Sequence, residues 1–346
     1  MRLQAAVLSN AGRVREKNED NFYYNGEFMP ATNRGVDAHQ EWFQLDNPAL
    51  FGVFDGMGGY AAGERASNLT AQAADRLWRE WDRTGPPANL MERICMEANS
   101  VVCDAMEADN GRRMGSTASM LMFDNEQYHV CNIGDSPIFL LRQGQLWEIS
   151  MEHTERWTFE KVTGQKAPPK KKFRLTQNIG INEDAMAIEP YCGDGPIQKG
   201  DVFLICSDGV TDMLDREEVQ EILSKPLPTG EMIRQLLAGA LEAGGKDNIT
   251  AICLRVCLDP MPEEPAAPQA APRKAPAKAG KKPGKRKWGL IFGGVGLAVA
   301  VAAGAVTLGL TRGGKNKGIN VKEIVSGSLF CPMETGDIGT IDFDLN

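Results

Sequence analysis

Histidine and paired cysteines are scarce in this chain. Its 346 residues include three histidines, His39, His129 and His153, and none of its eight cysteines forms a C-x-x-C pair. Histidine-rich zinc sites, zinc ribbons, thioredoxin-like sites and Ser-His-Asp triads therefore find little support. If the chain is an enzyme, we expect its chemistry to depend on carboxylates.

An excess of positive charge and an N-terminal apolar run are also missing. The net charge of −8 argues against a nucleic-acid partner, because phosphate backbones require a basic surface. The N-terminal sequence MRLQAAVLSNAGRVREK lacks the long apolar core of a signal peptide. Most cysteines lie within apolar runs, where free thiols behave as small core side chains, which suits a reducing compartment. We therefore expect the main domain to lie in the cytoplasm.

The composition divides the chain into four parts. Residues 1–258 have the mixed pattern of a folded domain, whereas residues 259–287 are rich in Pro, Ala and Lys and predict an extended linker. Residues 288–311 carry no charge and are long enough to cross a bilayer as a helix. A buried core helix is the alternative, but the basic linker and the polar tail, residues 312–346, supply no core around it.

The predicted transmembrane helix also has a predicted orientation. Eight Lys and Arg residues lie between Arg273 and Lys287, and they outnumber Arg312, Lys315 and Lys317 on the far side. The positive-inside rule then places the N-terminal domain in the cytoplasm and the tail outside. We expect a single-pass protein of the cell membrane.

Hydrophobic periodicity predicts three helices in the N-terminal domain, over residues 87–109, over 229–244 and from about 61 to 81. Apolar residues at helical spacing predict the inner face of the first: Leu90, Ile94, Ala98, Val101 and Ala105. The inner face of the second is predicted in the same way: Met232, Leu236 and Ala240. Short apolar runs bounded by turn residues predict strands over 49–55, 117–124, 127–135, 201–208 and 248–256.

Acidic residues recur where the predicted strands end or begin. Asp55, Asp135 and Asp208 each follow an apolar strand, and Asp247 stands where another strand begins. In an antiparallel arrangement all four could meet at one edge of a sheet. A single such Asp is most simply a turn residue, but four of them beside a Gly-rich turn favour a cluster. Clustered carboxylates repel unless a cation lies among them, and oxygen-only ligands select Mg²⁺ or Mn²⁺ rather than zinc.

Seven sequence blocks occur in the order typical of one protein family. They are GRVREKNEDN, GVFDGMGGYAAGERAS, GSTAS, CNIGDS, LTQNIG, GDVFLICSDGVTDML and GGKDNITAICL. Over residues 1 to about 258 the chain resembles the bacterial metal-dependent protein phosphatases of the protein phosphatase 2C family. The resemblance implies an α+β fold of four layers, αββα. In it, pairs of helices flank a central antiparallel β-sandwich that carries the metal site at one edge.

The resemblance implies a binuclear site for Mn²⁺ or Mg²⁺. Asp55 would bridge the two cations, and the Gly56 carbonyl would be a further ligand. Asp208 and Asp247 would complete one of the two metal sites. Small neighbours of Asp55 would let backbone and water reach the metals.

The remaining matches receive roles in the same way. Glu19 and Asp20 would serve the second metal, partly through water, and Asp135 with Asp208 would hold a weaker third metal. Arg15 matches the family arginine that grips the substrate phosphate, a role that suits its bidentate fork.

The implied reaction is hydrolysis of phosphoserine and phosphothreonine in proteins, with Arg15, Asp55 and Asp208 as catalytic residues. A water shared by two cations is acidified toward hydroxide and attacks the phosphorus in line, so no phosphoenzyme is required. Met57 stands where animal relatives carry a histidine proposed as general acid. Because methionine cannot donate a proton, a metal-bound water would have to protonate the leaving oxygen.

The chain departs from the family pattern near the flap expected beside the active site. Pro137 replaces the arginine that usually follows GDS, and residues 152–154 read EHT where DHS is usual. The short segment that follows carries Lys170, Lys171 and Lys172, either as a solvated loop or as a contact for an acidic or phosphorylated substrate segment. These changes bear on substrate choice and leave the expected metal ligands intact.

Three functional hypotheses follow from these patterns. The leading one is a membrane-anchored phosphatase that acts on phosphorylated proteins and opposes a Ser/Thr kinase. The second is a catalytically silent relative that binds phosphoproteins or holds a partner at the membrane. The third is a sensor whose tail, residues 312–346 with Cys331, modulates the domain, against the simpler interpretation of a short disordered end.

Overall fold

The structure, a computed structural model, describes residues 2–45, 48–58, 62–167, 173–182 and 186–257. Several sequence predictions fall outside these ranges: the linker, the transmembrane helix, the tail and the Lys170–Lys172 cluster. Within the described part of the chain, no helix combines the length and the apolar character that crossing a bilayer would require.

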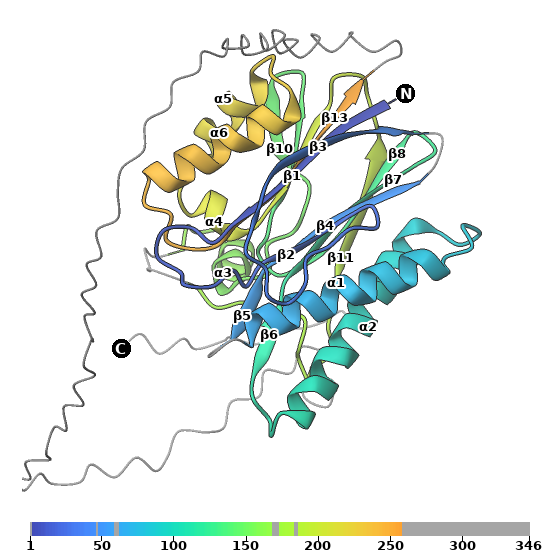
Figure 1. Ribbon diagram of the computed structural model, residues 1–346, viewed down its shortest axis with the longest axis vertical. Helices are drawn as coiled ribbons and strands as arrows, with labels where there is room; N and C mark the ends of the chain where they lie inside the picture. Colours follow the sequence, from blue (N-terminus) through green and yellow to red (C-terminus); the bar gives the residue numbers. More distant parts are fainter. Residues whose placement is uncertain (1, 46–47, 59–61, 168–172, 183–185, 258–346) are drawn as a thin grey trace, which may run out of the picture. The chain divides into compact units, whose positions relative to one another are not determined.

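Two antiparallel sheets form the centre of the domain (Figure 1). The first sheet, in the order β10-β9-β12-β13-β1-β3, comprises β10 (Gln145–Glu148), β9 (Ile138–Arg142), β12 (Val202–Cys206), β13 (Ile249–Cys257), β1 (Arg2–Asn10) and β3 (Val36–Gln44). The second, in the order β11-β8-β7-β4-β2, comprises β11 (Tyr191–Pro196), β8 (Gln127–Ile133), β7 (Ala118–Asp124), β4 (Ala49–Phe54) and β2 (Asn21–Tyr24). Strands β5 (Gly56–Gly58) and β6 (Met114–Ser116) form a short separate pair, and Asp55 is the single residue between β4 and β5.

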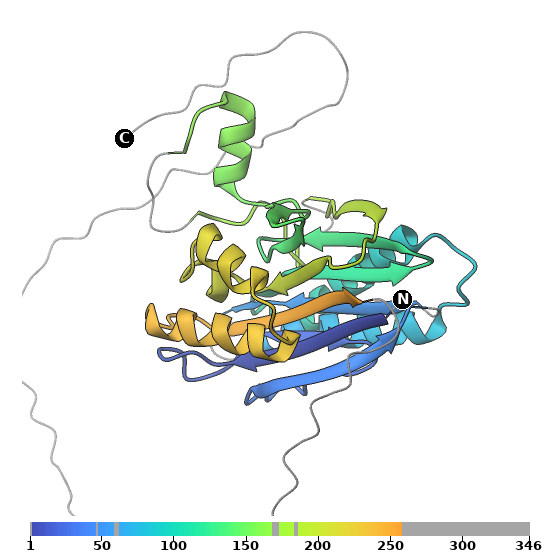
Figure 2. The ribbon, with the colours of Figure 1, turned by 90° about the horizontal axis from the view of Figure 1, so that it is seen from above.

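Helices cover the outer face of each sheet and complete four αββα layers, as the resemblance implied. Helices α1 (Gly63–Glu80) and α2 (Pro87–Ala108) lie on one side, and α5 (Arg216–Ser224) and α6 (Thr229–Glu242) lie on the other (Figure 1). The short helix α4 (Asp208–Thr211) follows β12 directly. Helix α3 (Glu155–Thr163) contains no buried residue and stands out from the body of the domain (Figure 2).

Three apolar cores hold the four layers together. The central core lies between the sheets, where Phe123 makes edge-on contacts with Phe51 and Phe203 at centroid distances of 6.3 and 5.2 Å. One outer core joins α1 and α2 to the second sheet, and the other joins the C-terminal helices to the first sheet. Because successive side chains of a strand point to opposite faces, Ile252 of β13 enters the central core and Cys253 the outer one.

The structure confirms the predicted elements and corrects one residue of a helix face. The three predicted helices correspond to α1, α2 and α6, and the five predicted strands to β4, β7, β8, β12 and β13. In α2, Val102 is buried and Val101 only partly so, because a step of four residues from the buried Ala98 leads to Val102. The inner face predicted for α6 is confirmed, since Met232 and Leu236 are fully buried together with Ala240.

Candidate metal centre and active site

Carboxylates from both sheets meet at one edge of the sandwich. Asp55 follows β4 and Asp135 follows β8, whereas Asp208 comes after β12 and Asp247 precedes β13. Asp55 interacts electrostatically with all three of the others and with Asp20, which lies in the loop between β1 and β2. The structure therefore brings together the strand-end carboxylates that the sequence predicted to meet.

Asp55 is the carboxylate whose negative charge is most disfavoured by its surroundings. Burial raises its pKa well above the ordinary value, and the charges of Asp20, Asp208, Asp135 and Asp247 raise it further. Its backbone is fixed by Thr117: the Asp55 N–H donates to Thr117 Oγ1 at 2.9 Å, and the Asp55 carbonyl accepts from the Thr117 N–H at 2.8 Å. The carboxylate is thus held in place although its environment disfavours its charge.

The turn that carries Asp135 is joined to the same anchor. Thr117 Oγ1 lies 2.7 Å from Ser136 Oγ, and Ser119 Oγ donates to the Ser136 carbonyl. On the other side of the turn, the Gly134 N–H donates to His153 Nδ1 at 3.2 Å. These supporting contacts place Asp135 relative to Asp55, and composition alone gave no sign of them.

Asp20 is fully buried beneath the cluster and is tied to the first sheet. Its Oδ2 accepts a hydrogen bond of 2.8 Å from Ser207 Oγ, the residue before Asp208. Burial raises the pKa of Asp20 to about 7, against the lowering effect of hydrogen bonds from Ser207 and Thr250. Its electrostatic interactions with Asp208 and Asp247 raise that pKa as well.

Glycines allow three backbone segments to approach one another beside Asp55. A Cβ on Gly56 would collide with the carbonyl oxygens of Glu19 and Gly63, and a Cβ on Gly63 would lie 2.8 Å from the Gly56 oxygen. That same Cβ would lie 2.9 Å from Cδ of Glu19, so the Gly56 carbonyl and the Glu19 carboxyl face one small space. Burial raises the pKa of Glu19, while Arg15 lowers it.

Arg15 and Asp247 form an ion pair at the rim of the cluster. Arg15 Nη2 lies 2.7 Å from Asp247 Oδ2, and the guanidinium also interacts with Glu19 and Asp55. The neighbouring Asn248 organises the loop that carries Arg15: its Oδ1 accepts from the Glu19 N–H at 2.8 Å. Its Nδ2 donates to the carbonyls of residues 11 and 17 at 3.0 and 2.8 Å. The structure therefore places Arg15 at the site, where the sequence predicted it.

The donor set at this edge fits a hard divalent cation. Its side-chain donors are carboxylate oxygens, the Gly56 carbonyl adds a backbone oxygen, and the carboxylates repel one another in the absence of a counter-charge. Among the described residues, no three carboxylates are arranged to hold an ion by themselves. An ion bound here would draw part of its coordination from water, as Mg²⁺ commonly does.

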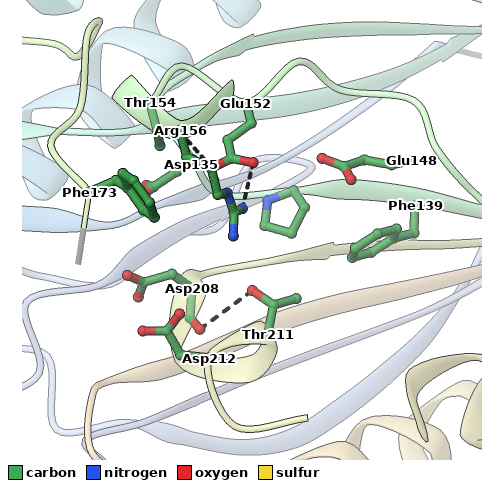
Figure 3. Close-up of a pocket in the computed structure, with 11 residues that line it drawn as sticks. Asp135, Phe139, Glu148, Glu152, Thr154, Arg156, Phe173, Asp208, Thr211 and Asp212 are labelled. Carbon is green, nitrogen blue, oxygen red and sulfur yellow. Dashed lines mark hydrogen bonds and ion pairs between the residues drawn. The ribbon is translucent and has the colours of Figure 1, made fainter. Parts of the chain in front are cut away.

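A pocket of about 240 Å³ opens beside the cluster (Figure 3). Its wall includes Asp135 and Asp208 and continues away from them along β9, β10 and the start of α3. The residues that line it are Asp135, Pro137, Phe139, Glu148, Glu152, Thr154, Arg156, Phe173, Asp208, Thr211 and Asp212. Pro137 and the segment from Glu152 to Thr154, where the sequence departs from the family pattern, thus border one pocket.

Sequence reasoning missed the hydrogen-bonding residues beneath the carboxylates. All of them lie within the sequence blocks that carry the resemblance. Three are direct neighbours of predicted ligands in the sequence: Ser207, Asn248 and Ser136. The fourth, Thr117, is bonded to the backbone of Asp55. Met57 lies in the middle of β5, opposite Gly115, and offers no proton donor at its side chain.

Comparison with known proteins agrees with this geometry. Residues 33–242, more than half of the chain, match the family described as Protein phosphatase 2C. The serine/threonine protein phosphatase PstP of Mycobacterium tuberculosis is 28% identical over 257 residues, which cover 72% of this chain and 44% of that protein. The serine/threonine phosphatase Stp of Listeria monocytogenes is 27% identical over 261 residues, which cover 72% of this chain and 94% of that protein.

A solved structure shows the same likeness. The catalytic domain of the Mycobacterium tuberculosis phosphatase PstP in complex with two manganese ions superposes with a TM-score of 0.60 at 28% identity. The match covers 75% of this chain and 100% of that one. The carboxylate cluster, the four-layer fold and the family match lead to one assignment: the chain belongs to the protein phosphatase 2C family.

Proposed function

We propose that this chain is a divalent-metal-dependent phosphatase that removes phosphate from serine and threonine residues of proteins. The observation that carries the proposal is the cluster of Asp55, Asp135, Asp208 and Asp247, drawn from both sheets to one edge of the sandwich. The names of the relatives from Mycobacterium and Listeria support the substrate class.

The chain's own residues would bind and orient the phosphate. A divalent cation at the cluster supplies a Lewis acid that lowers the pKa of a coordinated water and offsets phosphate charge. Arg15, at the rim of the cluster, suits two phosphate oxygens because its guanidinium presents parallel donors. Asp55 is kept in position by its two backbone hydrogen bonds with Thr117. Because Met57 holds no acidic proton, the leaving oxygen takes its proton from solvent.

The proposed enzyme also has expected cations, an expected opposing kinase and an expected place in the cell. Two cations, Mn²⁺ or Mg²⁺, are supported by the two manganese ions of the PstP catalytic domain. A weaker third cation at Asp135 and Asp208 is supported by the place of these two carboxylates on one pocket wall. A Ser/Thr kinase with the same substrates is the natural opposing activity. The uncharged residues 288–311 support a single membrane anchor, with the catalytic domain in the cytoplasm and residues 312–346 outside.

The decisive experiment measures release of phosphate from a phosphothreonine peptide by the full-length protein in detergent. We expect activity that requires added Mn²⁺, is lost with EDTA, and falls at least about a hundredfold in Asp208→Asn. No phosphate release with Mn²⁺ by a folded protein would contradict the proposal. Calorimetric titration with Mn²⁺ then addresses the silent alternative, because a non-catalytic phosphoprotein binder has no need of the metal.

A further inference from the structure

The pocket beside the metal centre extends beyond the groups that the reaction itself requires. Asp135 and Asp208 form its inner end, and Phe139 and Glu148 lie at its far side (Figure 3). Its volume of about 240 Å³ is below the roughly 300–1,000 Å³ of sites that enclose a whole small molecule. A space of this size, open to the phosphate site, suits one side chain of a larger substrate.

The charge of the pocket wall is negative. Five carboxylates line it, Asp135, Glu148, Glu152, Asp208 and Asp212, against one guanidinium, that of Arg156. A negatively charged wall with a small opening favours a cationic group.

Arg156 does not reverse this preference, because Glu152 already neutralises it. Arg156 Nη2 donates to Glu152 Oε2 at 2.7 Å, and Thr154 Oγ1 donates to Glu152 Oε1 at 2.7 Å (Figure 3). Both oxygens of Glu152 are therefore engaged within the wall. The guanidinium of Arg156 also lies 6.0 Å from the ring centroid of Phe173, which fixes it at the side of the pocket.

Two lining carboxylates remain when the predicted metal ligands and the Glu152 pair are set aside, Glu148 and Asp212. Asp212 lies beside Asp208, so the carboxylate at the far side of the pocket is Glu148 (Figure 3). It sits at the end of β10, directly across from Phe139 on β9. The nearest basic group is Arg216 Nη1 at 4.0 Å, between side chains that are 45% and 36% exposed, so water screens that contact. Arg216 stays beside this wall, since its Nη2 donates to the Leu146 carbonyl at 2.6 Å and its guanidinium lies 5.9 Å from the ring centroid of Phe139.

Aromatic rings add a second preference. Phe139 and Phe173 line the pocket, and each ring already has one of the chain's own guanidinium groups beside it, Arg216 at 5.9 Å from Phe139 and Arg156 at 6.0 Å from Phe173. A guanidinium can lie flat against an aromatic ring and bond a carboxylate with its edge at the same time. The ammonium of lysine is a compact point charge and makes less use of such a wall.

Resting on the proposed phosphatase function, we propose that this pocket is a specificity subsite that binds an arginine side chain of the substrate, near the phosphorylated residue. Glu148 is the residue that determines the preference, and Phe139 and Phe173 supply the apolar part of the pocket lining. Proteins phosphorylated close to an arginine are then the preferred substrates of this enzyme.

The test uses full-length protein with Mn²⁺ and phosphothreonine peptides of one common sequence. Each peptide carries Arg, Lys, Ala or Glu at a single position within four residues of the phosphothreonine. The readout is the ratio of kcat/KM for the Arg peptide to that for the Ala peptide, measured within each variant. We expect a ratio of about ten at one position, the scale of one charge-assisted contact, with Lys between Arg and Ala.

Glu148→Gln should bring this ratio to within about twofold of one, and Glu148→Lys should make the Glu peptide the better substrate. Glu231→Gln is the matched control, because Glu231 is also a glutamate with a partly exposed side chain and a long contact, 3.6 Å, to an arginine, but on α6 outside the pocket. The control should keep the ratio of the unmodified protein.

Two failures can be told apart. If no peptide at all is hydrolysed with Mn²⁺, the proposed function fails and the subsite falls with it. If the peptides are hydrolysed at equal rates, or if the ratio survives in Glu148→Gln, the subsite is refuted and the phosphatase function stands.

Discussion

Arg15 Nη2 lies 2.7 Å from Asp247 Oδ2, and this ion pair joins the loop after β1 to the loop before β13. The pair places a fixed positive charge at the rim of a carboxylate cluster. The hydrogen bond to Asp247 is the main reason why the pKa of Arg15 is raised. A divalent cation arriving at Asp247 must therefore compete with this guanidinium, which is also the group that we propose binds the phosphate.

Removal of the Arg15 guanidinium should affect metal and substrate in opposite directions. In Arg15→Ala, we expect Mn²⁺ to bind up to about fivefold more tightly, because an exposed ion pair that opposes binding is gone. We expect kcat/KM for a phosphopeptide to fall about 10- to 100-fold, the scale of one charged hydrogen bond or two. Calorimetry with Mn²⁺ and steady-state kinetics measure the two effects separately.

Arg15→Lys serves as the control that keeps the positive charge but removes the planar, bidentate guanidinium. It should keep metal affinity near that of the unmodified protein and recover only part of kcat/KM, because an ammonium does not form the bidentate contact. Weaker Mn²⁺ binding in Arg15→Ala would show that the ion pair prepares Asp247 for the metal instead of competing for it.

Asp55→Asn should make the metal-free protein more stable and the enzyme inactive. Burial and four neighbouring carboxylates disfavour the charge of Asp55, so a neutral side chain of the same shape removes repulsion from the folded state. In EDTA we expect the melting temperature to rise, by about 2–4 °C for each kcal/mol gained in a domain of this size.

Addition of Mn²⁺ should separate the two proteins further. The unmodified chain should gain stability with Mn²⁺, because a ligand that binds only the folded state stabilises it, whereas Asp55→Asn should gain little. Activity should fall at least about a hundredfold. A variant that melts below the unmodified protein in EDTA would mean that the carboxylate has a structural role that outweighs the repulsion.

The carboxylate cluster could be predicted from the sequence because four of its members stand just after or just before an apolar strand. Asp55 and Asp135 follow β4 and β8, which both pair antiparallel with β7 and therefore end at the same edge of the second sheet. Asp208 follows β12 of the first sheet, and the packing of the two sheets brings it to that edge. The helices could be predicted for a similar reason, since a continuous buried face leaves a clear periodicity. The valine misplaced on α2 shows the limit: a wide buried stripe makes two adjacent positions equally plausible.

The remaining parts left weaker signals in the sequence. Strand β3, an edge strand with no fully buried residue, lies in a polar segment that has no apolar alternation to reveal it. The hydrogen bonds of Thr117 with Asp55 and of Asn248 with residues 11, 17 and 19 connect positions 62 to 237 apart, so no local pattern encodes them. The pocket wall is assembled from β9, β10 and α3 by tertiary packing, and only Pro137 and the segment from Glu152 to Thr154 marked it in advance.

Gly56→Ala should damage the site through backbone crowding alone. The new Cβ would meet two backbone carbonyl oxygens, those of Glu19 and Gly63, and neither can rotate away as a side chain would. We expect a loss of about 3 kcal/mol in the free energy of unfolding, measured by urea denaturation, and a loss of Mn²⁺ binding. Gly85→Ala is the control, because nothing lies within 4 Å of its added Cβ, and it should be neutral or slightly stabilising. Equal stability of the two variants would contradict the crowding argument.

The proposed membrane anchor predicts where the protein is found in cells. With residues 288–311 intact, we expect the full chain in the membrane fraction after carbonate extraction, and deletion of these residues should release it to the supernatant. Substitution of two central residues, Leu297 and Val301, by Arg should have the same effect as the deletion, since charge at the bilayer centre is costly. Unchanged membrane association after the deletion would show that a different segment binds the membrane.

Asn248→Ala should loosen the loop that carries Arg15 and Glu19 without touching a carboxylate. Asn248 makes three hydrogen bonds to backbone atoms of residues 11 to 19, and alanine would leave the partly buried Glu19 N–H and two carbonyls without these partners. We expect a loss of about 2–3 kcal/mol in the free energy of unfolding and a rise in KM for the phosphopeptide that exceeds the fall in kcat. Asn89→Ala, at an exposed position of α2, should change the free energy of unfolding by no more than about 0.5 kcal/mol and should leave KM unchanged. If the Asn248 variant kept its KM while losing stability, the loop would be held at the site by the Arg15–Asp247 pair alone, and the double variant Arg15→Ala with Asn248→Ala would then raise KM more than the two single effects combined.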